Sequence, residues 1–204
     1  MKENKYDDNI FFQKYSQMSR SQQGLAGAGE WETLRKLLPD FKDKRVLDLG
    51  CGYGWHCIYA MEHGASSVVG VDISHKMLEV AKEKTHFPQV EYKCCAIEDV
   101  EFPEESFDVI LSSLAFHYVA DYEILVKKIY RILKSGGKLV FTVEHPVFTA
   151  YGTQDWYYNE KGEILHFPVD NYYYEGKRTA VFLGEKVTKY HSCLLYTSPS
   201  PRDA

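Results

Sequence analysis

The chain has 204 residues, of which 45% are hydrophobic and 26% are charged, and its formal net charge is −5. This length is typical of a single domain, and the composition excludes a collagen-like or wholly disordered chain. The negative charge argues against nucleic acid as the main partner, and no apolar run approaches the ~20 residues that a membrane-spanning helix needs.

The first forty residues are predicted to be helical, because apolar residues recur at helical spacing until Pro39. Strand-like and helical runs then alternate. Predicted strands span residues 45–50, 67–72, 90–95, 107–113 and 138–144, and predicted helices span 55–64, 74–85 and 121–137. Ser74 is expected to cap the second of these helices, and Gly136 and Gly137 to end the third. Strands that are nearly continuous in Val, Ile and Leu and are separated by crossovers predict a parallel sheet covered on both faces. The fold class is therefore α/β, with a short irregular crossover at residues 98–106.

The composition changes after Val147. Gly, Pro, Asn and Asp interrupt the next segment, residues 151–174, so we do not expect a helix there. Its eight aromatic residues are Tyr151, Trp156, Tyr157, Tyr158, Phe167, Tyr172, Tyr173 and Tyr174. Residues 180–191 are predicted to form a strand, a Gly-centred turn and a second strand.

Residues 193–204 stand apart from the rest of the chain, because they show no periodicity and no capping pattern. They resemble the translated read-through of a sequencing adapter. We therefore expect the natural sequence to be represented only up to about Ser192; a disordered tail of Ser and Pro is the alternative.

The N-terminus is polar and acidic and lacks the apolar core of a signal peptide. The five cysteines lack CxxC spacing; they are Cys51, Cys57, Cys94, Cys95 and Cys193. We expect free thiols, no metal site and a cytoplasmic location.

A glycine-rich loop follows the first predicted strand. Gly50, Gly52 and Gly54 lie between this strand and a helix, and Asp48 precedes them by two positions. Glycine permits a tight turn and a close approach to a ligand, and a helix N-terminus favours anionic groups. A dinucleotide site would have its third glycine where Trp55 stands. An acid at position 48 can accept a hydrogen bond from an ammonium group, which S-adenosylmethionine has and the nicotinamide dinucleotides lack; a purely structural turn is the alternative.

A second acid ends the next predicted strand. Asp72 lies 22 residues after Gly50, and an acid at the end of a second parallel strand can bind both hydroxyls of a ribose. Ile73 beside it offers an apolar wall to adenine. These two strand ends together indicate a cofactor that contains a nucleoside.

At these motifs the chain resembles the class I S-adenosylmethionine-dependent methyltransferases, in particular the type 11 and ubiquinone-biosynthesis-like group of small-molecule enzymes. The matching segments are DLGCGYG (48–54), VGVDIS (69–74), AIEDVEFPEESFDVI (96–110), SSLAFHYV (112–119) and LKSGGKLVFT (133–142). The resemblance implies a Rossmann-like doubly wound sheet of strand order 3-2-1-4-5, with a helical N-terminal cap and with the family's final antiparallel strand pair missing. It also implies methyl transfer from S-adenosylmethionine to a small molecule.

The resemblance assigns residues to the cofactor. Asp48 and the loop backbone would hold the methionine part, and Asp72 would bind the ribose. Because Ala96 stands where many relatives carry a carboxylate or amide, the adenine edge would be contacted by the Ile97 backbone or by Glu98. The implied cofactor-binding residues are Asp48, Gly50, Cys51, Gly52, Tyr53, Gly54, Asp72, Ile73, Met77, Ala96, Ile97, Glu98 and Ser113. The N-terminal helices are expected to cover the cofactor, within reach of Tyr15 and Arg20, although no spacing predicts these two contacts.

Methyl transfer from a sulfonium is an in-line displacement, which needs a general base only if the acceptor loses a proton. His117 is the candidate base, because it follows the carboxyl end of a predicted strand, where α/β sheets place ligands; a packing role is the alternative. His145 is the second candidate, in a turn that Pro146 keeps out of a helix; turn geometry alone is the alternative. The aromatic segment is either a lid over the acceptor or packing over the sheet edge.

We expect one domain at 1–192, made of a cap (1–40), a cofactor-binding core (45–145) and an acceptor-side segment (146–192), followed by a foreign tail at 193–204. The rival functions are a nicotinamide-dependent oxidoreductase and a cofactor-binding protein without catalysis. The partner is expected to be a small-molecule acceptor, with no nucleic acid and no membrane; the oligomeric state is not predicted. Without the last strand pair, an uncovered sheet flank is expected to weaken stability and cofactor binding.

Overall fold

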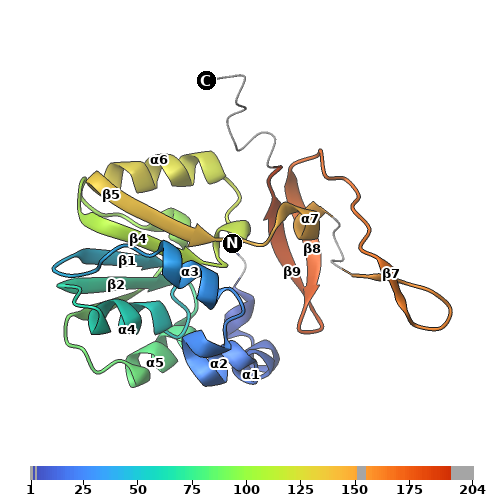
Figure 1. Ribbon diagram of the computed structural model, residues 1–204, viewed down its shortest axis with the longest axis horizontal. Coiled ribbons are helices and arrows are strands. Elements are labelled where there is room, and N and C mark those ends of the chain that lie inside the picture. Colours follow the sequence, from blue (N-terminus) through green and yellow to red (C-terminus); the bar gives the residue numbers. More distant parts are fainter. Residues whose placement is uncertain (1, 3, 151–154, 194–204) are drawn as a thin grey trace. The chain divides into compact units, whose positions relative to one another are not determined.

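The computed structural model describes residues 2, 4–150 and 155–193 of the chain (Figure 1). Its contacts divide the chain into two compact units. Unit 1 comprises residues 1–116 and 121–143, and unit 2 comprises residues 117–120 and 144–204. The single domain expected at 1–192 stays a prediction. None of the helices within the described ranges is long and apolar enough to cross a membrane.

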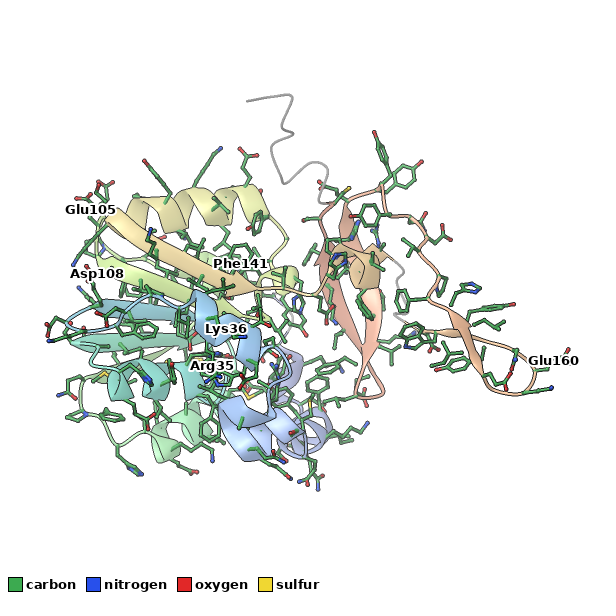
Figure 2. The ribbon with its side chains drawn as sticks, in the orientation of Figure 1. Arg35, Lys36, Glu105, Asp108, Phe141 and Glu160 are labelled. Carbon is green, nitrogen blue, oxygen red and sulfur yellow. The ribbon has the colours of Figure 1, made fainter. Side chains whose placement is uncertain are left out.

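Unit 1 contains a five-stranded parallel sheet. Its strands are β1 (Arg45–Leu49), β2 (Ser67–Asp72), β3 (Val90–Cys94), β4 (Phe107–Ser113) and β5 (Leu133–Thr142). Their order is β3-β2-β1-β4-β5 with parallel neighbours throughout, which confirms the predicted Rossmann-like fold class. Both faces are covered, because Val46, Leu47 and Leu49 of β1 are fully buried. Asp108, at the amino end of β4, and Phe141, near the carboxyl end of the neighbouring strand β5, mark the two opposite ends of these parallel strands (Figure 2).

Helices connect these strands and pack against them (Figure 1). The connecting helices are α4 (Trp55–Glu62) on β1 and β2, α5 (His75–Lys84) on β2 and β3, and α6 (Tyr122–Ile132) on β5. The crossover at 98–106 is short and irregular, as predicted. Its first two residues belong to the 3-10 helix η3 (Ile97–Asp99). Ser74 caps α5, as predicted, by accepting a hydrogen bond from the N–H of Met77 at 3.1 Å.

The N-terminal residues form several short helices instead of one long one. They are η1 (Lys5–Asp7), α1 (Asn9–Ser16), α2 (Ser19–Gln23), η2 (Gly24–Gly27) and α3 (Trp31–Leu37). The prediction of a helical segment is confirmed. Gly24, with φ of +64°, turns the chain between α2 and η2. Asp7 joins this segment to the sheet layer, because its carboxylate accepts a hydrogen bond from the Ser74 hydroxyl at 2.6 Å.

The predicted boundary between the last helix and the last strand of unit 1 is wrong. The helix expected at 121–137 ends at Ile132, and β5 begins directly at Leu133. Leu133 pairs with Phe107, and the N–H of Ser106 donates to the carbonyl of Ile132 at 2.8 Å. These long-range bonds take the chain out of the helix early. Gly136, at φ of +75°, therefore lies inside an irregular strand and does not end the helix.

Unit 2 is built from one short helix and two antiparallel hairpins. These are α7 (Pro146–Ala150), β6 (Tyr157–Tyr158) with β7 (Ile164–His166), and β8 (Gly176–Phe182) with β9 (Glu185–His191). The second hairpin confirms the strand, turn and strand predicted at 180–191, although β8 begins earlier. Its turn residues Leu183 and Gly184 have φ of +55° and +78°, as a type I′ turn requires. The main sheet keeps five strands among the described residues.

The aromatic segment lies in unit 2, around β6 and β7. Phe167 packs against Phe148 and Trp156, with ring centroids 4.8 and 5.2 Å apart. Tyr157 and Tyr173 are more than half exposed. Tyr151 lies outside the described residues. Exposed aromatic rings beside a small ring cluster are compatible with either a lid or local packing, so both alternatives stay predictions.

Candidate functional site

The loop between β1 and α4 turns tightly at its three glycines. Gly50, Gly52 and Gly54 have φ of +78°, +52° and +75°, a region that side chains disfavour. A Cβ on Gly50 would lie 2.4 Å from the Cβ of Ala115, and a Cβ on Gly54 would lie 2.1 Å from the Tyr92 hydroxyl. The predicted need for glycine at these positions therefore has two causes, backbone conformation and close packing.

Asp72, at the end of β2, holds this loop in place. Its carboxylate accepts hydrogen bonds from the N–H groups of Gly52 at 2.8 Å and Ser74 at 2.9 Å. Burial raises the pKa of Asp72 to about 6, against the lowering effect of these two bonds. The backbone N–H of Ile73 is a third donor to this carboxylate. Because a carboxylate offers about four acceptor positions, one of them remains for a hydroxyl group of a ligand.

A pocket of about 480 Å³, open solvent included, lies against the loop within unit 1. Its lining comes from the loop, from α4, from the end of β4 and from the N-terminal helices: Gly50, Cys51, Gly52, Tyr53, Trp55, His56, Ser113, Tyr15, Arg20, Ser21, Gly24, Leu25, Ala28 and Glu30. The structure thus brings predicted residues of the loop and of β4 together with Tyr15 and Arg20.

An ion pair in this pocket was not predicted. An Arg20 nitrogen donates to both carboxylate oxygens of Glu30, at 2.6 Å each, and the Ser113 hydroxyl donates to Glu30 at 3.0 Å. Glu30 had no sequence signal, because it lies 83 residues before Ser113 in a segment without a spacing pattern. The pair places a fixed positive and a fixed negative charge in one pocket.

Two aromatic side chains of α4 also line the pocket. Burial lowers the pKa of His56 to about 4, so its imidazole is neutral near pH 7. The indole nitrogen of Trp55 is buried and has no hydrogen-bond partner among the described residues. Trp55 occupies the position at which a dinucleotide-binding loop has its third glycine. Its side chain forms part of the pocket lining instead.

Asp48 lies beneath the loop and does not line the pocket. It is almost fully buried, and its Oδ2 accepts a hydrogen bond from the Cys57 thiol at 3.5 Å. Burial raises its pKa to about 7, and the nearby Asp72 carboxylate adds to this effect. Its predicted contact with the cofactor stays a prediction.

Five further residues that were predicted to bind the cofactor lie outside this pocket lining. Ala96 and Ile97 are buried at the start of η3, and Met77 is buried in α5. The carbonyl of Ile73 accepts a hydrogen bond from Asn4 at 3.2 Å, and Glu98 lies 3.9 Å from the Lys2 ammonium. None of these contacts tests the predicted roles.

The buried His117 lies beside two charged residues in unit 2. Its Nε2 lies 3.9 Å from the Glu144 carboxylate, which in turn forms an ion pair with Lys189 of β9. Burial lowers the pKa of His117 to about 4, although the Glu144 carboxylate acts in the opposite direction. Its Nδ1 is buried without a hydrogen-bond partner in the described part of the chain. The sequence predicted His117 but not the two charged residues around it.

His145 has a structural role in unit 2. Its side chain is exposed, and its Nδ1 accepts a hydrogen bond from the N–H of Val147 at 3.2 Å at the start of α7. Pro146 begins that helix, as its fixed φ favours. This cap agrees with the turn predicted at 144–146, and the proposed role toward the acceptor stays untested.

Comparison with known proteins identifies the family. The methyltransferase domain family matches residues 47–141. A Listeria monocytogenes structure described as a candidate S-adenosylmethionine-dependent methyltransferase is 56% identical, with a TM-score of 0.79, over 83% of this chain and 80% of that one. A Mesorhizobium loti S-adenosylmethionine-dependent methyltransferase is 40% identical, with a TM-score of 0.78, over 85% and 79%.

A curated relative agrees over a shorter region. The ubiquinone biosynthesis O-methyltransferase of Coxiella burnetii is 36% identical over 112 residues, which are 54% of this chain and 47% of that protein. The chain thus spans about half the length of this relative. The predicted family and cofactor are confirmed, and the chain belongs to the class I S-adenosylmethionine-dependent methyltransferases, with S-adenosylmethionine as its cofactor.

Proposed function

We propose that this protein transfers the methyl group of S-adenosylmethionine to a small-molecule acceptor, a reaction of class EC 2.1.1, and that the pocket of unit 1 holds the cofactor. The observation that carries the assignment to this pocket is the glycine loop tied to Asp72. The pocket borders this loop, and the residues present fit the cofactor: backbone groups of residues 50–54 would face the methionine part, and Asp72, which is bonded to Gly52 but is not itself part of the pocket lining, would bind the ribose hydroxyls.

S-adenosylmethionine supplies an activated methyl group when bound. The chain's own residues then have to orient the reactants and exclude water. The loop backbone packs closely against Ala115 and Tyr92, and such packing favours the fixed loop geometry that orientation of the reactants needs. The remaining residues of the predicted cofactor set, Ile73, Met77, Ala96, Ile97 and Glu98, belong to this proposal on the strength of the family motif.

His117 is proposed as the general base where the acceptor loses a proton. At neutral pH its imidazole is uncharged, because burial lowers its pKa to about 4. A neutral imidazole with an unpartnered buried Nδ1 can accept a proton, and the Glu144 carboxylate faces the other ring nitrogen. His145 is retained as the second acceptor-side residue.

The acceptor is proposed to be a small molecule with apolar or aromatic surface. The exposed rings of the aromatic segment in unit 2 support this, since such rings bind flat or oily groups and cations. The net charge of −5 argues against a nucleic-acid acceptor.

Calorimetry with S-adenosylhomocysteine and with NAD tests the cofactor pocket. We expect S-adenosylhomocysteine to bind with a Kd on the order of 1 μM, about 8 kcal/mol, and NAD not to bind. Asp72→Ala should weaken binding by ~1.5–3 kcal/mol, the scale of hydrogen bonds to a charged group. Asp155→Ala, at an exposed position of unit 2, is the matched control. Unchanged affinity in Asp72→Ala would overturn the assignment of Asp72.

A further inference from the structure

The cofactor pocket contains a pair of opposite charges that the N-terminal segment supplies. Arg20 and Glu30 belong to different short elements, α2 and the residue before α3, and their side chains are about one fifth exposed. An Arg20 nitrogen contacts both Glu30 oxygens at 2.6 Å. Both residues line the pocket next to the loop glycines, so their charges face a ligand there.

Both groups are charged near neutral pH. Burial alone would raise the pKa of Glu30, but a backbone N–H, the Arg20 guanidinium and the Ser113 hydroxyl together lower it below its ordinary value. The Glu30 carboxylate likewise raises the pKa of Arg20, against the effect of burial. Arg20 also donates a hydrogen bond to the Tyr15 hydroxyl.

Arg20 has binding capacity left for a ligand, because a guanidinium carries five N–H donors, more than its contacts with Glu30 and Tyr15 use. The Glu30 carboxylate accepts from Arg20, Ser113 and a backbone N–H, so a ligand cation would share or replace one of these bonds and add a second positive charge beside the carboxylate. A ligand that matches them has to carry one anionic and one cationic group a few bonds apart. The amino-acid end of S-adenosylmethionine, with an α-carboxylate and an α-ammonium, has this chemistry.

We propose that Arg20 and Glu30 form a clamp for the amino-acid end of the cofactor, in which Glu30 accepts a hydrogen bond from the ammonium and Arg20 donates to the carboxylate. The inference rests on the proposed function of this pocket. It assigns the ammonium to Glu30, which lines the pocket, whereas Asp48 lies beneath the loop against Cys57.

Ser113 is the positioning residue of this clamp. Its hydroxyl donates to Glu30 at 3.0 Å and lies 3.2 Å from the Thr142 hydroxyl. These contacts link Glu30 to the carboxyl ends of β4 and β5. The N-terminal segment is thereby tied to the rim of the sheet at the residue that would hold the cofactor.

Calorimetry with three ligands tests the clamp on the full chain. The ligands are S-adenosylhomocysteine, its analogue without the amino group, and 5′-methylthioadenosine, which lacks the whole amino-acid end. We expect Glu30→Gln to weaken S-adenosylhomocysteine binding about tenfold to a hundredfold, the range for a hydrogen bond to a charged group. The same variant should bind the other two ligands within about twofold of the wild-type affinity, because neither carries an ammonium.

Glu32→Gln is the matched control, because Glu32 is exposed and pairs at 2.7 Å with Arg35, which lies on α3 in Figure 2. It should leave all three affinities unchanged, and the melting temperatures of both variants report on folding. The clamp is overturned if Glu30→Gln binds S-adenosylhomocysteine as tightly as the wild type, or if it weakens all three ligands equally. Failure of the wild-type chain to bind S-adenosylhomocysteine contradicts the proposed function itself, which separates the two results.

Discussion

Burial controls the charge of the acidic and imidazole groups around both candidate sites. Asp72 and Asp48 have raised pKa values because they leave water, whereas Glu30 has a lowered one because Arg20 and Ser113 compensate for its burial. Burial also disfavours the charged form of His117, so its imidazole is neutral near pH 7. Single residues of the same type therefore differ in charge according to their partners, and their roles differ accordingly.

His117 is expected to affect turnover more than cofactor binding. If it is the general base, His117→Ala should lower kcat about 10²-fold or more, because the imidazole that accepts the proton is removed. The measurement is transfer of a labelled methyl group to an acceptor found by screening phenols, alcohols and amines, with calorimetry of S-adenosylhomocysteine alongside.

The pKa of His117 determines the pH dependence expected in that assay. A base with a pKa of about 4 is unprotonated throughout the neutral range, so kcat should be flat from pH 6 to 8 and fall only as the pH approaches the pKa. His86→Ala, at an exposed position, is the control. Unchanged turnover with weakened cofactor binding in His117→Ala would instead show a packing role.

At the scale of elements, the cofactor pocket depends on the connection from β1 to α4. Strand β1 is held between buried neighbours, and helix α4 begins at Trp55. The loop between them leaves no space for a side chain at Gly50. The N-terminal helices add charged groups to this frame, and they are held by short polar contacts such as the one between Asp7 and Ser74. Close packing therefore constrains the backbone of the loop, whereas the charged side chains beside it, Arg20 and Glu30, come from separate short elements.

Gly50→Ala should damage the loop. The new methyl group would meet Ala115 at 2.4 Å and would have to adopt φ of +78°, so we expect a loss of about 1–3 kcal/mol in the free energy of unfolding. For a chain of this size that corresponds to a melting temperature lower by roughly 2–10 °C. Gly29→Ala, where nothing lies within 4 Å, should cost far less in the same thermal scan. Equal melting temperatures for the two variants would contradict this account of the loop.

At the scale of the whole molecule, the buried Asp48 makes stability depend on pH. Its pKa rises from 3.8 to about 7 on folding, so the folded chain binds this proton more tightly than the unfolded chain. Between these two pH values the unfolded state has fewer protons at this site, and the free energy of unfolding falls as pH rises. The full effect of such a shift is at most about 4 kcal/mol.

Asp48→Asn should remove this dependence. Relative to the wild type, its free energy of unfolding should increase from pH 4 to about pH 7 and then level off, as measured by urea unfolding at several pH values. Glu104→Gln, at an exposed position, should show a constant difference from the wild type. A difference between Asp48→Asn and the wild type that does not change with pH would falsify the link between burial of Asp48 and stability.

The sequence by itself determined the parallel sheet, its strand order through the family resemblance, and the cofactor. Short segments of the sequence predict these features: apolar runs of strand length, three glycines at GxGxG spacing, and Asp72 at the end of the next strand. Their physical causes are local, since a positive φ or a buried strand constrains the residues at that place and needs no distant partner. For the same reason the Ser74 cap and the hairpin at 180–191 were predicted correctly.

Tertiary structure alone decided which charged groups meet. Glu30 and Ser113 are 83 residues apart, and Lys189 and Glu144 are 45 residues apart, so no local pattern could pair them. It also decided where α6 ends, because bonds from Ser106 and Phe107 of the neighbouring segment overrode the glycines that follow. Contacts between distant segments depend on how the whole chain packs, and that packing moved the proposed ammonium contact from a motif residue to Glu30.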